Sequence, residues 1–206
     1  MSPLVIMMLV AVLAYLVGSV SFAIVVSRLR GLADPRSYGS HNPGATNVLR
    51  SGDRMAAIFT LLGDAAKGLV VVLIAQWLGP RMLGEVDQTL LVATAGFAVF
   101  LGHLFPIYFR FQGGKGVATA FGVLLAFDAV LGLLVGAVWL VVAKLGRISS
   151  LAALAAAVAA PLLTYWRHGS GLMLWSVIGI ALLLIVRHRS NIAQLIAGKE
   201  KAFKKS

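Results

Sequence analysis

The sequence predicts an all-α integral membrane protein that crosses the bilayer seven times, and three observations lead to this fold class. Of the 206 residues, 60% are hydrophobic, and the mean hydropathy is +0.93. A soluble domain of this size could not bury so much apolar surface. The apolar residues form segments close to the roughly 20 residues that a helix needs to span a membrane, and the basic residues gather between them. We treat residues 1–206 as a single transmembrane domain.

The apolar segments are the predicted spans. In chain order they are Leu4–Val26, Met55–Leu78, Thr89–Phe109, Val117–Ala143, Leu151–Trp166 and Leu172–Val186. The first has no basic segment before it and is too long for the apolar core of a cleaved signal, so we expect a retained span. We expect Gly79-Pro80 to end the second span and Gly169–Gly171 to separate the last two.

The fourth segment, Val117–Ala143, is longer than one crossing needs and carries Asp128 near its middle. The positions of the basic residues decide how often it crosses. All but three of the Lys and Arg residues, namely Lys67, Arg81 and Arg167, lie in four clusters: Arg28 to Arg54, Arg110 with Lys115, Lys144 with Arg147, and Arg187 onward.

The positive-inside rule places all four clusters in the cytoplasm, so an even number of crossings must join each cluster to the next. We therefore predict that residues 117–143 form two short helices that turn near Phe127-Asp128. Two helices so short must be shielded by their neighbours or sit in a thinned bilayer. This gives seven spans with the N-terminus outside and the C-terminus in the cytoplasm. A single long helix is the alternative, and it would put the last polar segment across the membrane from the others.

The formal net charge is +11, from 18 basic and 7 acidic residues. In a soluble protein this excess would suggest nucleic acid, but no basic stripe alternates with exposed aromatic residues, so we expect no nucleic-acid partner. We expect anionic lipid head groups or phosphorylated substrates instead. The chain has no cysteine, which excludes disulfides and a thiol nucleophile. No spacing of histidines and carboxylates predicts a metal site.

Besides Asp128, the predicted spans carry Asp64, Lys67 and His103. Asp64 and Lys67 are three positions apart in the second span and share one helical face,. Because charges in a bilayer rarely face lipid, we expect an ion pair that pins two helices, with substrate contact as the alternative. His103 precedes Phe105-Pro106, and we expect it to cap or bond a carbonyl freed by the proline; a catalytic role is its alternative.

The first of three polar segments, residues 37–50, combines glycines, side-chain donors and one arginine, with carboxylates only at its margins. Pro43-Gly44 predicts a turn, and Thr46 is predicted to be the N-cap of a short helical stretch. Arginine is the best bidentate partner for phosphate. An ordinary cytoplasmic loop is the alternative. The candidate ligand-binding residues are Gly39, Ser40, Asn42, Gly44, Thr46, Asn47 and Arg50.

The second polar segment is Gly113-Gly114-Lys115-Gly116. Glycines let the backbone turn and aim several N–H groups at one point. If a helix begins at Val117, its N-terminus adds a favourable dipole, and Lys115 adds a full positive charge. The spacing differs from that of a P-loop, but the segment predicts a phosphate cradle. A flexible interfacial turn with a snorkelling lysine is the alternative.

The third polar segment begins at Arg187. His188 and Asn191 are three positions apart and face one way on a helix,, so they could orient a hydroxyl or a phosphate. Arg187 and Arg189 could equally be anchors of the positive-inside kind. We expect Glu200, the lone acid of a basic tail, to tie that tail down rather than to catalyse.

Together these segments resemble the acyl-phosphate:glycerol-3-phosphate acyltransferase (PlsY) family of bacterial inner membranes. The match covers nearly the whole chain, in order and with similar spacing. The matching stretches are Gly39-Ser40 with Gly44 to Arg50, Gly102-His103 through Pro106, Gly113 to Thr119, and Arg187-His188 with Asn191-Ile192, Leu195, Gly198 and Glu200. Gln194 departs from the arginine that the family often has, and Ala152-Ala153 depart slightly from a common Ser-Leu-Gly pattern.

The resemblance implies a seven-helix enzyme of the bacterial inner membrane whose active site faces the cytoplasm. It implies transfer of a fatty acyl group from an acyl phosphate to the 1-hydroxyl of sn-glycerol 3-phosphate. The products are lysophosphatidic acid and inorganic phosphate, in the first acylation step of phospholipid synthesis. It further implies catalytic roles for Ser40, Arg50, Lys115, His188 and Asn191, and substrate binding by Ser150 and by the donors and glycines of the first two segments. We expect no cofactor and no obligate protein partner.

The expected mechanism is direct attack by the substrate hydroxyl. An acyl phosphate already has a good leaving group, so orientation and charge neutralisation matter most. No serine lies in a Gly-x-Ser-x-Gly elbow, which argues against a covalent acyl-enzyme. The proton could pass to His188 or to a substrate phosphate. The rival functions are a transporter of phosphorylated solutes, which inverted repeats would support, and a structural subunit, which would leave the phosphate-binding loops unexplained.

Overall fold

The computed structural model describes residues 2–200 and 202, and within them every regular element is a helix, which confirms the all-α prediction. Lys201, Lys204 and Lys205 of the last basic cluster lie outside the described residues. The α-helices are α1 (Pro3–Gly18), α2 (Phe22–Leu29), α3 (Ala45–Val48), α4 (Arg54–Met82), α5 (Glu85–Leu104), α6 (Val117–Phe127), α7 (Ala129–Gly146), α8 (Ser149–His168), α9 (Leu172–Arg187) and α10 (Arg189–Ile196), with 3-10 turns η1 (Leu49–Ser51) and η2 (Ile107–Phe109).

The first predicted span, Leu4–Val26, lies within the membrane-spanning segment Pro3–Leu29. This segment is broken between α1 and α2 at residues 19–21, where Ser19 donates its hydroxyl to the Tyr15 carbonyl. The prediction that Gly79-Pro80 ends the second span is wrong, because α4 continues to Met82. A proline lacks the N–H group for one helical hydrogen bond. In the last turn of a helix this loss affects few further hydrogen bonds, so the helix can continue through it. Gly169–Gly171 separates α8 from α9 as predicted.

The predicted turn near Phe127-Asp128 is confirmed, and it rules out a single long helix. Asp128 adopts an extended conformation between α6 and α7, and its carboxylate caps α7 by accepting from the amides of Val130 and Leu131. The two helices are antiparallel, since Gly132 packs on Leu125 and Gly136 packs on Phe121. The short helix α6 is mostly buried and packs against α4 and α7, which is the shielding that its length requires.

Close packing at glycines fixes the directions of neighbouring helices. A side chain at Gly68 would collide with the Thr119 carbonyl, and one at Gly122 with the Ala65 carbonyl, so α4 and α6 are antiparallel and nearly in backbone contact. The same holds for α1 and α5 at Gly18 and Gly102. Small residues allow this approach in membrane proteins.

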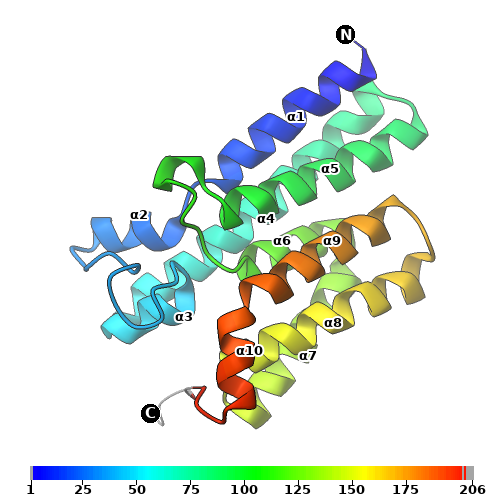
Figure 1. Ribbon diagram of the computed structural model, residues 1–206. Coiled ribbons are helices and arrows are strands. Elements are labelled where there is room, and N and C mark those ends of the chain that lie inside the picture. The colour runs from blue at the N-terminus through cyan, green and yellow to red at the C-terminus, as the bar shows by residue number, and fades with distance from the viewer. Residues whose placement is uncertain (1, 201, 203–206) are drawn as a thin grey trace.

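The long helices alternate in direction, so their ends form two opposite faces (Figure 1). The N-terminus and the α4–α5 and α8–α9 connections lie at one end of the bundle. The α2–α3 region, α10 and the last described residues lie at the other. All three polar segments belong to this second end, which we call the site face.

Five helical segments of the described chain are long and apolar enough to cross a membrane. They are Pro3–Leu29, Arg54–Met82, Asp87–Phe109, Ala129–Gly146 and Ser149–His168. A sixth is added if α9 and α10 are taken together, although they are bent by 59° at His188, and α6 is a shorter apolar helix. The fold is therefore a multi-helix membrane bundle of the predicted kind.

Candidate functional site

Side chains from the three polar segments meet at the site face. Lys115, which follows the glycines of the second segment, donates to the Asn191 side-chain oxygen on α10. Thr46 of the first segment lies 3.2 Å, oxygen to oxygen, from Ser149 at the start of α8. Segments that are far apart in the sequence therefore share one face, as the charge pattern predicted.

Asn47 organises the first segment from a buried position. Its amide nitrogen donates to the carbonyls of Pro35 and Tyr38 at 2.6 and 3.1 Å. Its oxygen accepts from the Ser40 backbone at 2.9 Å and from Arg50 at 3.4 Å. Both polar atoms of Asn47 are thus used inside the loop, where they hold Ser40 and Arg50 side by side.

The glycines of this segment have separate local reasons. Gly39 has φ +62° and lies so close to Asn47 that an added Cβ would be 2.2 Å from its Oδ1 atom. Gly44 is the N-cap of α3 in an extended conformation. The prediction that Thr46 caps this helix is therefore wrong: Thr46 lies inside α3, and its hydroxyl faces Ser149 instead. Asn42 is half-buried, with its side-chain nitrogen next to Gly44.

The glycine loop, residues 113–116, is held from two sides. Arg187 donates to the carbonyl of Gly113 at 2.7 Å and to that of Gly114 at 3.2 Å. On the other side the Gly114 amide donates to the His103 carbonyl at 3.2 Å, so this amide does not point freely into the site. Gly116 has φ +86° and is the N-cap of α6, which begins at Val117 as predicted. The first-turn amides of α6 retain the anion-binding character of a helix N-terminus.

His188 occupies the kink between α9 and α10. Its Nδ1 atom lies 2.8 Å from the Leu184 carbonyl, and since a carbonyl only accepts, Nδ1 carries the proton and Nε2 is left as an acceptor. Burial lowers the pKa of His188 to about 4, with Lys115 and Arg187 also lowering it against the Leu184 bond and Glu200. The imidazole is therefore neutral at neutral pH.

Glu200 joins α8, α10 and the glycine loop. Its Oε1 atom accepts from the Ser150 hydroxyl and from the Asn191 amide nitrogen, each at 2.7 Å, while the Asn191 oxygen accepts from Lys115. A continuous polar chain thus runs from Ser150 through Glu200 and Asn191 to Lys115. Glu200 is thereby tethered to α8 and α10, as expected, whereas residues 201 and 203–206 of the tail lie outside the described residues.

The site carries an excess of positive charge. Burial lowers the pKa of Lys115 most, the Glu200 carboxylate opposes this, and Arg187 and Arg50 lower it further. The half-buried Lys115 therefore has two positive neighbours, Arg50 and Arg187, one from each of the other polar segments, and the Glu200 carboxylate opposes them. An anion that entered this site would relieve their repulsion.

Beneath the glycine loop, the predicted Asp64–Lys67 ion pair is confirmed at 2.8 Å. The expectation for His103 is wrong, because its side chain contacts the Lys67 ammonium at 3.0 Å rather than a carbonyl. Lys67 also donates to the Val20 carbonyl at 2.7 Å. This group therefore pins α4 to α5 and to the α1–α2 break.

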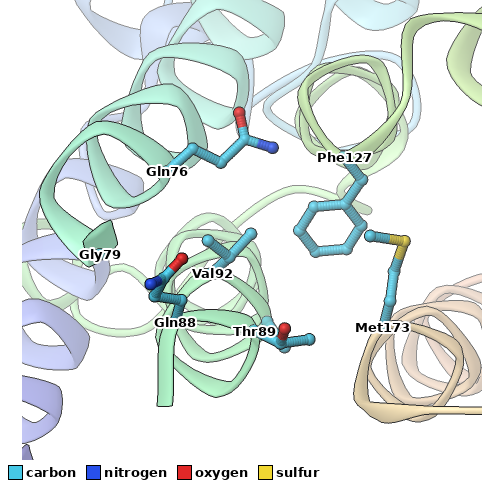
Figure 2. Close-up of a pocket in the computed structure, with 8 residues that line it drawn as sticks. Gln76, Gly79, Gln88, Thr89, Val92, Phe127 and Met173 are labelled. Carbon is cyan, nitrogen blue, oxygen red and sulfur yellow. The ribbon is translucent and has the colours of Figure 1, made fainter. Parts of the chain in front are cut away.

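A separate cavity of about 220 Å³ lies at the opposite end of the bundle, between the end of α4 and the starts of α5 and α9. Its lining includes Gln76, Gln88 and Thr89 together with Phe127 and Met173 (Figure 2). Gln76 donates its side-chain N–H to the Ala126 carbonyl at 2.8 Å, and none of the described residues that line the cavity is a cation. It lacks the chemistry of a phosphate site.

Sequence reasoning missed two contributors to the site. Arg187 was expected to be either a motif residue or a simple anchor, yet it bonds the backbone of the glycine loop. Ser149 was not a candidate, yet it contacts Thr46. An arginine at the end of an apolar span with no acidic partner nearby in sequence was the one signal for Arg187; nothing local marked Ser149.

Comparison with known proteins gives consistent results. The family model described as glycerol-3-phosphate acyltransferase matches residues 8–198. The chain is 59% identical over 200 residues to the glycerol-3-phosphate acyltransferase of Ralstonia pickettii, covering 97% of this chain and 95% of that protein. It is 58% identical over 193 residues to that of Cupriavidus metallidurans, covering 94% of each.

Two solved structures of PlsY (YgiH), an integral membrane glycerol 3-phosphate acyltransferase, have the same fold. The glycerol 3-phosphate form superposes with a TM-score of 0.88 at 36% identity and covers 96% of both chains. The lysophosphatidic acid form gives 0.86 at 35% identity, covering 96% of this chain and 95% of that one.

Proposed function

The chain belongs to the glycerol-3-phosphate acyltransferase family, and from this membership we propose that it acylates the 1-hydroxyl of sn-glycerol 3-phosphate. The acyl donor is a fatty acyl phosphate, and the products are lysophosphatidic acid and inorganic phosphate. Solved relatives in glycerol 3-phosphate and lysophosphatidic acid forms support the acceptor and the product. This would be the first acylation step of bacterial phospholipid synthesis.

The observation that carries the proposal is the meeting of Arg50, Lys115 and Arg187 at one face with Glu200 as the opposing carboxylate. Two phosphorylated substrates require such a surplus of cations, since each brings a dianion into a partly dehydrated space. Arg50 and Lys115 neutralise the phosphates in this proposal. The remaining amides of the glycine loop and the first turn of α6 add fixed dipoles.

The other site residues orient the reacting groups. Ser40, held beside Arg50 by Asn47, donates to the acyl carbonyl or its phosphate. Ser150 and Asn191, linked through Glu200, line the glycerol 3-phosphate side. Gly39, Asn42, Gly44, Thr46 and Asn47 shape the first loop of the site, and Gly113, Gly114 and Gly116 shape the second.

The chemical step is direct transfer. The substrate hydroxyl attacks the acyl carbonyl, the bond from that carbonyl carbon to the phosphate oxygen breaks, and the hydroxyl proton leaves on the released phosphate. The transfer requires no additional base, because the released phosphate takes the proton. A group whose pKa is about 4 is a weak base at neutral pH, so in this proposal His188 orients glycerol 3-phosphate and does not take the proton of the attacking hydroxyl.

The acyl tail needs an apolar path to this face. A hollow of about 360 Å³ runs along α5 between α1 and α9 and is lined by Leu90, Phe97, Leu101 and Leu172. Leu101 is one helical turn from the end of α5, and the ring of Phe105 beyond it lies 5.7 Å from the Arg187 guanidinium. We assign the tail to this hollow, which opens sideways toward lipid.

The proposed topology has seven crossings in the bacterial inner membrane, with the N-terminus outside and both the C-terminus and the site in the cytoplasm. It counts α1 with α2, then α4, α5, α6, α7, α8 and α9. The basic clusters support it through the positive-inside rule. Burial of α6 among its neighbours supports a crossing by so short a helix. We propose that the enzyme works without a cofactor or an obligate protein partner.

One assay tests the function. Purified protein in a lipid phase is given palmitoyl phosphate and glycerol 3-phosphate, and inorganic phosphate and lysophosphatidic acid are measured with no other protein present. Both products should appear in equal amounts, and acyl-CoA should not replace the acyl phosphate. Turnover with acyl-CoA, or no turnover with acyl phosphate, would overturn the proposed donor.

A further inference from the structure

A buried charged cluster of Asp64, Lys67 and His103 lies directly under the glycine loop. The three side chains are between 2% and 6% exposed. The Lys67 ammonium is 2.8 Å from Asp64 Oδ1 and 3.0 Å from His103 Nδ1. Because an ammonium can only donate, His103 Nδ1 is the acceptor and the ring proton is on Nε2.

An ion pair of this kind contributes little to stability by itself. The cost of removing two charges from water often equals or exceeds their mutual attraction, so well-packed apolar residues do as well. What the cluster touches is therefore the better guide to its role. Lys67 also donates to the Val20 carbonyl. The imidazole of His103 is therefore the group of this cluster that faces the polar segments.

The glycine loop packs directly against His103. A Cβ added to Gly114 would lie 2.3 Å from His103 Nε2 and 3.0 Å from the carbonyl oxygen of Pro43, which belongs to the first polar segment. A Cβ on Gly113 would lie 2.2 Å from the His103 carbonyl oxygen, which also accepts from the Gly114 amide. The loop is thus pressed between the imidazole and the first segment.

The opposite side of the loop is fixed as well, because Arg187 binds the carbonyls of Gly113 and Gly114. The loop can move only if the imidazole or the guanidinium moves. Lys115 follows these two glycines directly, so the place of its ammonium depends on both supports. Lys67 holds the imidazole, and Asp64 holds Lys67.

We propose that Asp64, Lys67 and His103 are positioning residues. They fix the position of the glycine loop and thereby the affinity of Lys115 for a substrate phosphate. The inference rests on the proposed function for the identity of that phosphate. None of the three residues needs to touch substrate.

The test is the double variant Asp64→Asn/Lys67→Met, which removes both charges together and so leaves no unpaired buried ion. We expect its Tm to fall by no more than about 5 °C. We expect the KM of glycerol 3-phosphate or of acyl phosphate to rise roughly tenfold, because a displaced ammonium makes a poorer charge-assisted bond. The kcat should stay within about threefold, since the groups at the reacting atoms are unchanged.

The matched control is Asp128→Asn/Arg167→Met, which removes another ion pair, 2.7 Å long, at the opposite end of the bundle. Both of its KM values should equal those of the wild type. A merely structural cluster would lower the Tm or the active fraction of Asp64→Asn/Lys67→Met and leave both KM values unchanged. That result, or a loss of kcat alone, would overturn the proposal.

Gly114→Ala provides a second test that leaves the charges intact and applies even if the double variant does not fold. Its methyl group meets the imidazole, so the same KM should rise, and an unchanged KM would overturn the proposal. Wild-type turnover is measured first. No turnover by the wild type defeats the proposed function, whereas normal wild-type turnover with unchanged variants defeats the positioning role alone.

Discussion

At the scale of single residues, the site is built around Lys115, which has two positive neighbours, Arg50 and Arg187, and Glu200 as its negative neighbour. None of the three cations forms an ion pair among the described residues. Each is held by neutral groups: Asn47 holds Arg50, Asn191 holds Lys115, and backbone carbonyls hold Arg187. Cations held by neutral acceptors keep their charge available for a ligand.

Lys115→Met tests this directly. Loss of one charge-assisted hydrogen bond of about 1.5–3 kcal/mol should raise the KM of at least one phosphate-bearing substrate by roughly 10- to 100-fold. Lys144→Met removes an exposed cation near the end of α7 and serves as the control, with no change expected. Equal KM values for Lys115→Met and the wild type would show that Lys115 binds no phosphate.

The protonation state of His188 predicts how kcat depends on pH. Because its pKa is lowered to about 4, it is neutral from about pH 5 to 8 and should not shape the kcat profile there. His188→Gln, which keeps an acceptor, should lose less kcat than His188→Ala, and both should show the pH dependence of the wild type. An acid limb present in the wild type and absent from both variants would make His188 the base.

Two substitutions of Glu200, by Gln and by Ala, are expected to differ in their effect on activity. Glu200→Gln keeps a side-chain oxygen to accept from Ser150 or Asn191 and should retain at least about a third of the activity. Glu200→Ala frees Asn191 and should cost roughly tenfold or more in kcat/KM. The two variants are compared under the same conditions, and equal activities would mean that the tether is not needed.

At the scale of helices, the charge pattern predicted the most demanding feature, the hairpin of α6 and α7, because Asp128 interrupts an apolar run between two basic clusters. It did not predict the end of α4, because proline is tolerated in a last turn and only the surroundings decide. The role of Arg187 was also beyond sequence reasoning, since it depends on the glycine loop folding back against the end of α9. Local sequence patterns predict the helices and their breaks, whereas the contact partners of individual side chains depend on the tertiary fold.

Asp128 should stabilise the α6–α7 turn through its cap and its contacts with Arg167 and His168. Asp128→Ala loses the cap, at about 1 kcal/mol, and should melt below Asp128→Asn, which can still cap. Burial opposes its ionisation, but the Leu131 amide and Arg167 lower its pKa to about 2 from 3.8. The ionised form therefore stabilises above pH 3.8, and this is lost as the pH falls toward 2.

The measurement is the Tm of the wild type and of both variants in detergent across this pH range. The gap between the wild type and Asp128→Asn should close as the carboxylate is protonated. A gap that stays constant down to pH 2 would show that the charge of Asp128 has no part in stability.

At the scale of the whole molecule, alternating helices bring three polar segments to one end of the bundle (Figure 1). The opposite end holds the α4–α5 and α8–α9 connections and the Asp128 cluster. A transporter of phosphorylated solutes would carry its charged site near mid-membrane, whereas here the cations Arg50, Lys115 and Arg187 gather at an end. A single face suits an enzyme whose one substrate arrives from water and whose other arrives from lipid.

The central claim is that the three polar segments open on the same, cytoplasmic side of the membrane, and cysteine labelling tests it most directly because the chain has no cysteine of its own. Single cysteines replace the exposed residues His41 and Ser190, which lie in the first and third segments, Gln112, which precedes the second, and Ser170 at the opposite end. With a membrane-impermeant thiol reagent on intact cells, Ser170→Cys should be labelled, and the other three only after permeabilisation. Labelling of His41→Cys, Gln112→Cys or Ser190→Cys from outside would contradict a common site.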